Sequence, residues 1–195
     1  MTPTPLSPRE VTELSGTPRH VVEKAIEERV LRVHVPTGRG GNGRRMLPMH
    51  AVLYAALISK LDLRLTPAHK KRLLGKLAHL KASDVRKARV ELAPAVEIDV
   101  GLLVGDVLAR AERYRAARDK SIQIDDAIMG GTPVVRGTRM TVYSVLGRIE
   151  HGETIDDVVA DNPDLSRDAV EAAVTYARTH PLMGRPAGRP WADAA

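Results

Sequence analysis

The 195-residue chain contains no cysteine and no phenylalanine, and only 3% of its residues are aromatic. The absence of cysteine excludes disulfides, thiol catalysis and every Cys-ligated metal site. So few aromatic side chains disfavour a stacking platform for single strands or RNA loops. No apolar run approaches the roughly 18 residues of a membrane helix, and the N-terminal MTPTPLSPRE has no signal-peptide core. We therefore expect a soluble, cytoplasmic protein with no membrane partner.

Charge is distributed unevenly along the chain. Residues 1–90 hold 18 Lys and Arg against 7 Asp and Glu, a net charge of +11. Residues 91–120 hold 5 against 6, and residues 121–180 hold 5 against 10. Solvated helix faces are the simple explanation, but +11 is more than solubility requires. The sequence thus predicts that the first 90 residues bind duplex DNA, even when separated from the rest.

Residues 7–28 have the pattern of a helix-turn-helix. The run Ser7-Pro8-Arg9-Glu10 combines a capping serine, a first-turn proline and a glutamate three residues after the serine, which is the signature of a capping box. Ser15-Gly16 ends this short helix, and Thr17-Pro18 begins a second one. Recognition helices contact DNA through their N-terminal turn. The predicted DNA contacts of the second helix are Thr17, Arg19, His20 and Lys24.

Two short extended runs, residues 31–35 and 44–47, flank a glycine-rich segment. A flexible basic hairpin after a helix-turn-helix is a wing, and the predicted DNA contacts here are Arg39, Arg44 and Arg45. In layout, residues 6–61 resemble the winged helix-turn-helix of MerR-like and excisionase-like regulators. The glycine-rich segment lacks the GK[ST] signature of a nucleotide-binding loop.

The middle of the chain predicts further helices and strands. Residues 49–61 are apolar almost all round, which indicates a buried core or dimer helix. Residues 88–99 alternate like short strands broken at Pro94, an edge or a linker. A helix from Val100 to near Ala117 carries an apolar seam only two heptads long. Such a seam favours packing on its own domain over a coiled coil, although we keep it as a second candidate dimer surface.

The run GGTPVVRGTR, residues 130–139, is the most distinctive in the chain. Gly137-Thr138 suits a type II′ turn, because Gly readily takes the positive φ at the first central position. In that register Arg136 and Arg139 lie opposite each other, and like charges across a strand pair are destabilising. We therefore expect an anion between them. It is a carboxylate of the chain (Asp125, Asp126 or Asp164), a partner's acidic surface or a phosphate.

This motif carries a resemblance. Residues from about 122 to 184 resemble the small antitoxin domain long described as a domain of unknown function, whose pattern includes Gly-Gly-x-Pro-Val-x-Arg-Gly-Thr-Arg. The chain departs from the pattern at Met140-Thr141, where Ile-Pro is usual, and at Asp126, where Pro often lies. The matching structural positions are Gly130, Gly131, Pro133, Gly137 and Thr138. The resemblance implies a VapB-type partner of a PIN-like ribonuclease toxin.

The C-terminal residues predict a helical module and a tail. Thr154 and Ser166 cap two helices that again look like a helix-turn-helix, but Asp168 and Glu171 on the second helix would repel phosphates. This module is therefore predicted to bind protein. Residues 181–195 are rich in Pro and Gly and read as a flexible tail. The predicted partner contacts are Arg136 and Arg139 in the hairpin and, in the tail, Arg185 and Arg189 with Trp191 as an aromatic anchor.

No candidate for catalysis emerges, because the seven histidines are scattered and none has the spacing of a metal ligand. We expect no enzyme, cofactor or metal. The fold is predicted to be mainly α, divided into a winged helix-turn-helix domain (1–85), a linker with short strands and a helix (86–120), an antitoxin-type domain with a short β-hairpin (121–184) and a tail (185–195). The expected function is that of an antitoxin that silences a PIN-like ribonuclease and, as a homodimer, represses its own operator. The alternatives are a free-standing transcriptional regulator whose C-terminal domain dimerises and an enzyme accessory subunit that never touches DNA.

Overall fold

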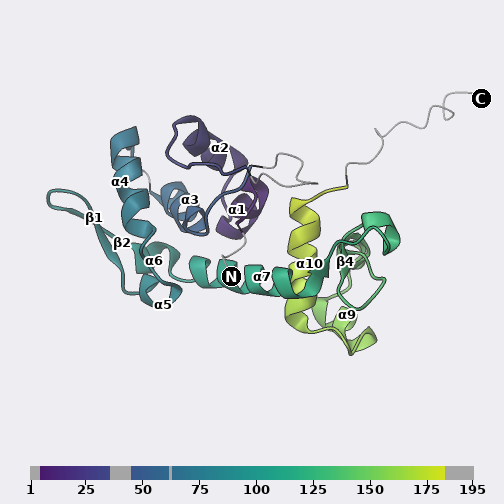
Figure 1. Cartoon of the computed structure of the whole chain (residues 1–195). Helices are drawn as coiled ribbons and strands as arrows, with labels where there is room; N and C mark the ends of the chain where they lie inside the picture. Colours follow the sequence, from purple (N-terminus) through teal and green to yellow (C-terminus); the bar gives the residue numbers. More distant parts are fainter. Residues whose placement is uncertain (1–4, 36–44, 62, 183–195) are drawn as a thin grey trace, which may run out of the picture.

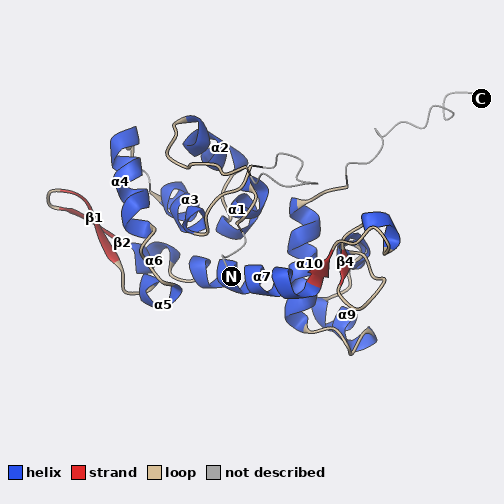
Figure 2. Ribbon diagram, in the orientation of Figure 1, coloured by secondary structure: helices blue, strands red, loops and turns tan. Residues whose placement is uncertain are grey.

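A computed structural model describes residues 5–35, 45–61 and 63–182 (Figure 1). The fold is mainly helical, as predicted, with two small antiparallel strand pairs (Figure 2). The described helices are α1 (Pro8–Ser15), α2 (Arg19–Glu27), α3 (His50–Lys60), α4 (Pro67–Leu77), α5 (Ala82–Val85), α6 (Val100–Val104), α7 (Val107–Ser121), α8 (Val142–Glu150), α9 (Ile155–Asp161) and α10 (Arg167–Thr179), with a 3-10 turn η1 (Met129–Gly131). The strands are β1 (Arg89–Ala93), β2 (Val96–Asp99), β3 (Ile122–Gln123) and β4 (Val134–Val135).

Helix α1 begins with the predicted capping box. The Glu10 N–H donates to Ser7 Oγ at 3.2 Å, and the Ser7 N–H donates to Glu10 Oε2 at 2.6 Å. Gly16 ends the helix in the left-handed region, with φ of 64°. Helix α2 follows directly after Pro18, so the helix-turn-helix outline of the sequence is present in the structure.

The chain between α2 and α3 forms the base of the predicted wing. His34 and Met46 make an antiparallel bridge, each N–H donating to the other's carbonyl at 2.8 Å. Leu47 pairs in the same way with Leu6, which ties this base to the residue before the Ser7 cap of α1. The predicted wing contacts Arg39 and Arg44 lie outside the described residues.

Helix α3 is the central helix of the N-terminal core. Its residues 51–57 are each at most 2% exposed, and α1, α2, α4, α6 and α7 all pack against it. Of the two alternatives for this apolar helix, the buried core is therefore correct. Because α3 and the apolar seam of α7 are covered within one chain, neither can be the surface that joins two copies.

Residues 86–120, predicted as a linker with short strands and a helix, contain strands and helices whose apolar side chains mostly belong to the core. Strands β1 and β2 pair as an antiparallel hairpin with Val90 opposite Ile98, and both side chains are buried. The predicted single helix from Val100 is broken near Gly105 into α6 and α7, and α7 continues to Ser121. Buried members of the core from these helices are Val100, Val104, Val107, Leu108, Ala111 and Tyr114.

The C-terminal helices form a second core. The predicted caps are present: Thr154 makes a capping box with Asp157, and Ser166 caps α10. The predicted apolar stripes meet in this core, which contains Val142, Val145, Val158, Val170, Ala173 and Val174. Helix α10 also packs on α7 and α1 (Figure 1), and its Ala172 is buried in the N-terminal core. The two cores are therefore joined through α10.

Candidate nucleic-acid interface and partner surface

Helix α2 presents three of its four predicted DNA contacts to solvent. Arg19, His20 and Lys24 are exposed, while Val22 and Ala25 hold the opposite face in the core. Arg19 Nε lies 2.6 Å from Glu23 Oε1 one turn further on. An exposed pair of this spacing contributes only about 0.3–0.5 kcal/mol, so a phosphate can compete for the guanidinium.

Thr17, the fourth predicted contact, is a correction. Its side chain is 6% exposed, and its hydroxyl lies 2.8 Å from the hydroxyl of Ser15. The turn folds Thr17 inward because Pro18, not Thr17, is the residue that precedes the first turn of α2. Thr17 therefore stabilises the turn and cannot reach DNA.

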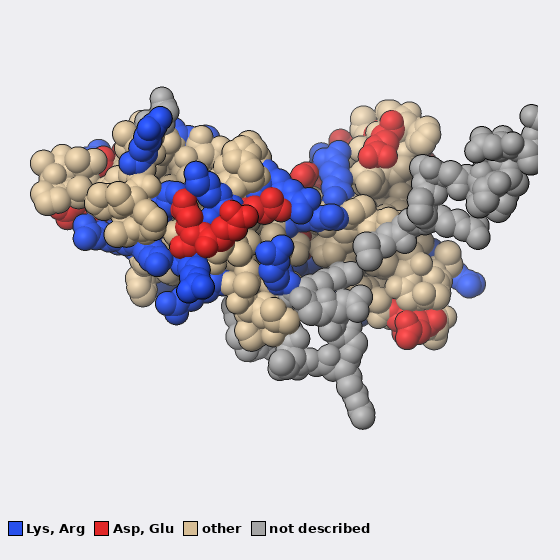
Figure 3. Space-filling model, turned by 90° about the horizontal axis from the view of Figure 1, so that it is seen from above, with Lys and Arg blue, Asp and Glu red and all other residues tan. Residues whose placement is uncertain are grey.

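Acidic side chains restrict where α2 can meet a polyanion. Glu27 is exposed and Glu23 is half-buried on this helix. Viewed from above, the N-terminal half shows a strip of acidic side chains with Lys and Arg on both sides (Figure 3). A phosphate contact through α2 would therefore involve its first turn, where Arg19 and His20 are exposed.

A basic cleft that the sequence analysis did not identify lies beside α2. It has a volume of about 320 Å³ and is lined by Arg29, Arg32, His50 and Lys71, among others. Burial, with a contribution from His79, lowers the pKa of His50, so its ring is neutral near pH 7. The net charge of residues 1–90 includes Arg29, Arg32 and Lys71. The sequence could not predict the cleft, because no local pattern shows that α4 packs next to the end of α2. Arg45, which follows the undescribed residues 36–44 of the predicted wing, is also exposed.

The hairpin turn of GGTPVVRGTR lies one residue earlier than predicted. The Thr138 N–H donates to the Val135 carbonyl at 3.0 Å, so the central residues are Arg136 and Gly137. Gly137 has φ of 79°, and a positive φ at the second central position belongs to a type II turn. The predicted type II′ turn is therefore wrong, and Arg136 lies within the turn instead of opposite Arg139.

Arg136 and Arg139 have different surroundings. Arg136 Nε donates to the Lys120 carbonyl at 2.8 Å, and its backbone N–H donates to the Ser121 carbonyl at 2.7 Å. Its charge thus lies at the C-terminal end of α7, where the helix dipole favours a cation. Because Arg136 and Arg139 do not face each other, no anion is needed between their side chains. Arg139 is exposed and forms no ion pair with any described residue; Arg185, Arg189 and Trp191 lie outside the described part of the chain.

The glycine pair of the motif is favoured by the backbone. Gly130 and Gly131 have φ of 62° and 77°, a region in which glycine carries no Cβ penalty. A Cβ on Gly131 would also lie 2.7 Å from Asp126 Oδ1, so the exposed Asp126 side chain would have to move.

A buried ion pair joins the helix-turn-helix to α7. Glu10 is 1% exposed, and its Oε1 accepts hydrogen bonds from Arg118 Nη1 and from the Tyr114 hydroxyl, both at 2.7 Å. Arg118 Nη2 also lies 2.9 Å from Asp119 Oδ1. The capping glutamate of α1 is thereby fixed to the middle of the chain.

The environment of Glu10 keeps it ionised. Burial alone would raise its pKa, but the Arg118 guanidinium and the hydrogen bonds from Ser7, Tyr114 and Arg118 together lower it. Burial and the negative charge of Glu10 raise the pKa of Tyr114, so the phenol stays protonated and donates. The sequence identified Glu10 only as a cap, because its partners are more than 100 residues away.

The described residues contain neither a cluster suited to a metal ion nor a helix suited to a bilayer. No group of three or more His, Asp or Glu side chains there is arranged to hold a metal ion. Among the helices described, none has both the length and the apolarity that crossing a bilayer requires.

Comparison with known proteins assigns a family model to one part of the chain. Residues 122–177, from β3 through most of α10, match the family described as "Protein of unknown function (DUF433)". An uncharacterized protein, y4eO, of Sinorhizobium fredii (strain NBRC 101917 / NGR234) is 38% identical over 76 residues, which are 39% of this chain and 34% of that protein. The chain thus spans about a third of the length of this relative. No solved structure matches the chain.

Proposed function

We propose that this protein is a DNA-binding antitoxin: its helix-turn-helix binds duplex operator DNA, and its C-terminal segment binds a PIN-like ribonuclease toxin. The observation that carries the DNA-binding part is the exposed first turn of α2, with Arg19, His20 and Lys24 on a helix-turn-helix in a half of net charge +11. A repressor acts where the DNA is, so the proposal includes a cytoplasmic location.

The toxin-binding part of the proposal is supported by the GGTPVVRGTR motif. Its resemblance to antitoxin domains was described above, and its residues fall within the segment that matches the family model. Arg139 is the arginine of the motif that is exposed and has no ion pair among the described residues. An Arg guanidinium pairs bidentately with carboxylates, so Arg139 could bind a carboxylate-rich active site. The tail arginines Arg185 and Arg189 remain a second predicted contact.

DNA binding is tested with the full chain and duplexes from upstream of its own reading frame. We expect affinity to fall steeply with salt, with a log–log slope of about −0.9 per neutralised phosphate. Arg45→Ala should weaken all sequences alike, whereas His20→Ala should also relax sequence preference. Binding that is equally tight at low and moderate salt, or equally tight after both changes, would contradict the assignment.

Toxin binding is tested by co-expression with the product of the neighbouring reading frame. A copurified complex in which that product's RNase activity is inhibited supports the proposal. The same assay with residues 183–195 deleted separates the tail from the Arg139 surface. Unchanged inhibition by the shortened chain assigns the contact to the hairpin.

A free-standing transcriptional regulator is the second candidate. It is favoured by the packing of α10 on both α7 and α1, because the family-matched segment is then held against the helix-turn-helix by contacts within the chain. In either case a helix-turn-helix of this size reads few bases, so we propose a homodimer on a pseudo-palindromic site. Light scattering of the protein, free and bound to DNA, measures this directly.

A further inference from the structure

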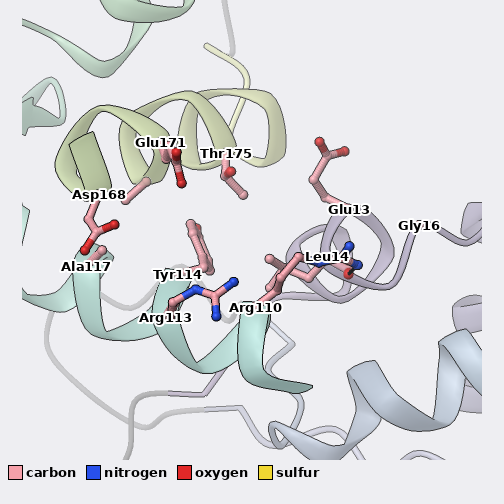
Figure 4. A pocket seen from close by; sticks show the side chains of 11 residues that line it. Glu13, Leu14, Gly16, Arg110, Arg113, Tyr114, Ala117, Asp168, Glu171 and Thr175 are labelled. Atoms are coloured by element: carbon pink, nitrogen blue, oxygen red, sulfur yellow. Dashed lines mark hydrogen bonds between the residues drawn. The ribbon is translucent and has the colours of Figure 1, made fainter. Parts of the chain in front are cut away.

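Helices α1, α7 and α10 enclose a cleft of about 450 Å³ between the helix-turn-helix and the family-matched segment (Figure 4). Leu14, Tyr114 and Ala172 contribute to its floor, and each is more than nine-tenths buried. Gly16, from the turn of the helix-turn-helix, also lines the cleft. The volume lies within the range of about 300–1,000 Å³ that is usual for small-molecule sites.

The rim of this cleft carries opposite charges on opposite walls. Arg110 and Arg113 belong to α7, whereas Asp168 and Glu171 belong to α10. In Figure 4 the Asp168 and Glu171 carboxylates extend from α10 toward α7, and the Tyr114 ring rises from α7 toward α10. A molecule in this space would have cations on one side and carboxylates on the other.

These charges do not neutralise each other across the cleft. Glu171 pairs instead with Arg167 on its own helix, at 3.0 Å. Within the described residues, Arg113 and Asp168 form no ion pair with each other or with any other side chain. Arg110 Nη2 donates to the Leu14 carbonyl at 3.4 Å. The charges left for a ligand are therefore chiefly those of Arg113 on one wall and Asp168 on the other.

We propose that this cleft binds a small dipolar molecule of the class of a free basic amino acid. Its carboxylate would pair with the guanidinium groups of Arg110 and Arg113, which can bind it bidentately. Its cationic end would pair with Asp168 and Glu171, and its aliphatic part would lie over Tyr114. A basic amino acid carries its carboxylate and its side-chain cation at opposite ends, which matches walls of opposite charge. Glu13 and Glu171 already lie 3.7 Å from Arg178 and 3.0 Å from Arg167, so Asp168 is the main carboxylate left for the cationic end.

The test is calorimetric titration of the full chain with L-arginine and L-lysine. We expect saturable binding that weakens with salt, and a higher thermal midpoint in the presence of either ligand. L-Glutamate and n-butylamine should bind at least about tenfold more weakly. L-Glutamate has a second carboxylate where a basic amino acid has its side-chain cation, and n-butylamine has no carboxylate. Arg113→Gln and Asp168→Asn should each weaken L-arginine binding about tenfold.

Matched controls are available because all the altered residues are exposed and the variants are expected to fold. Lys120→Gln, on α7, and Asp164→Asn make the same charge changes outside the cleft and should leave L-arginine binding unchanged. No binding of either basic amino acid would overturn the proposal. So would equal loss with the control variants, or binding of L-glutamate as tight as that of L-arginine. These outcomes do not depend on whether the protein binds DNA or a toxin.

Discussion

Glu10 shows at the scale of one residue what sequence can and cannot predict. Its position three residues after Ser7 predicts the capping box, which the structure confirms. The other oxygen of the same carboxylate accepts hydrogen bonds from Tyr114 and Arg118. Contacts between residues so far apart in the chain produce no local periodicity or spacing in the sequence. This buried network could therefore not have been predicted from one sequence.

Replacing Glu10 by Gln should destabilise the fold by about 3 kcal/mol near neutral pH, the low end for a broken buried ion pair. Arg118 would lose its buried counter-charge and keep only the exposed Asp119 beside it. Chemical denaturation measures the loss, and Glu27→Gln on the exposed face of α2 is the matched control. The expected change for the control is within about 0.5 kcal/mol.

The same variant has a predicted pH dependence. The pKa of Glu10 is lowered from 4.5 in the folded protein, so its stabilisation is complete above 4.5 and is lost as the pH falls through the lower folded value. Protonated Glu10 resembles Gln, and the stability difference between the wild type and Glu10→Gln should therefore shrink on acidification. A difference that stays constant from neutral to acidic pH would show that the charge of Glu10 is unimportant.

The two arginines of the hairpin give a second prediction at this scale. Arg136→Gln removes the hydrogen bond to the Lys120 carbonyl and a cation at the end of α7, and should lower stability by about 0.3–1 kcal/mol. Arg139→Gln touches no described partner and should leave stability unchanged while weakening toxin binding. Equal losses of stability, measured by thermal unfolding, would contradict the different roles assigned to them.

At the scale of elements, the caps and apolar stripes predicted most helices correctly. Errors arose where backbone contacts between residues distant in sequence determine the local conformation. The seam from Val100 continues in sequence across Gly105, yet the helix breaks there. A Cβ on Gly101 would lie 1.9 Å from the Arg86 carbonyl oxygen, so α6 is held directly against the residue that ends α5. Similarly, the Ser121 carbonyl binds the Arg136 N–H and fixes the turn one residue earlier than hairpin rules suggest.

Helix α2 gives the prediction that belongs to this scale. Arg19→Ala and Lys24→Ala should each weaken DNA binding and reduce the salt slope by about 0.9, if each contacts one phosphate. Glu23→Gln should act in the opposite direction, because it releases Arg19 from its partner on the helix. Fluorescence anisotropy across a salt series measures all three. Arg139→Ala removes the same charge from the other half, and an equal effect of that control would argue against contact through α2.

At the scale of the whole molecule, the segment predicted as a linker contributes side chains to the core. The chain from β1 to α7 covers α3, and Ala172 of α10 enters the same core. The alternation in residues 88–99 did predict strands. The sequence pattern of a strand pair is the same, however, whether the pair forms an exposed linker or packs on a core. Only tertiary packing distinguishes these cases, and single-sequence periodicity does not contain it.

This packing changes what is expected of the first 90 residues in isolation. Such a fragment has the net charge of +11, but it lacks Val100, Val104, Leu108 and Ala111, which help to complete the core around α3. Burying each of the larger apolar side chains contributes about 1.5–3 kcal/mol, so their combined loss is comparable to the 5–15 kcal/mol by which whole domains are stable. We predict that residues 1–90 unfold without a cooperative transition and bind DNA only non-specifically, whereas residues 1–121, which keep α7 and Arg118, fold cooperatively. Circular dichroism during heating distinguishes the two, and a sharp transition in the shorter fragment would restore the sequence-based view that the basic half is a complete DNA-binding domain.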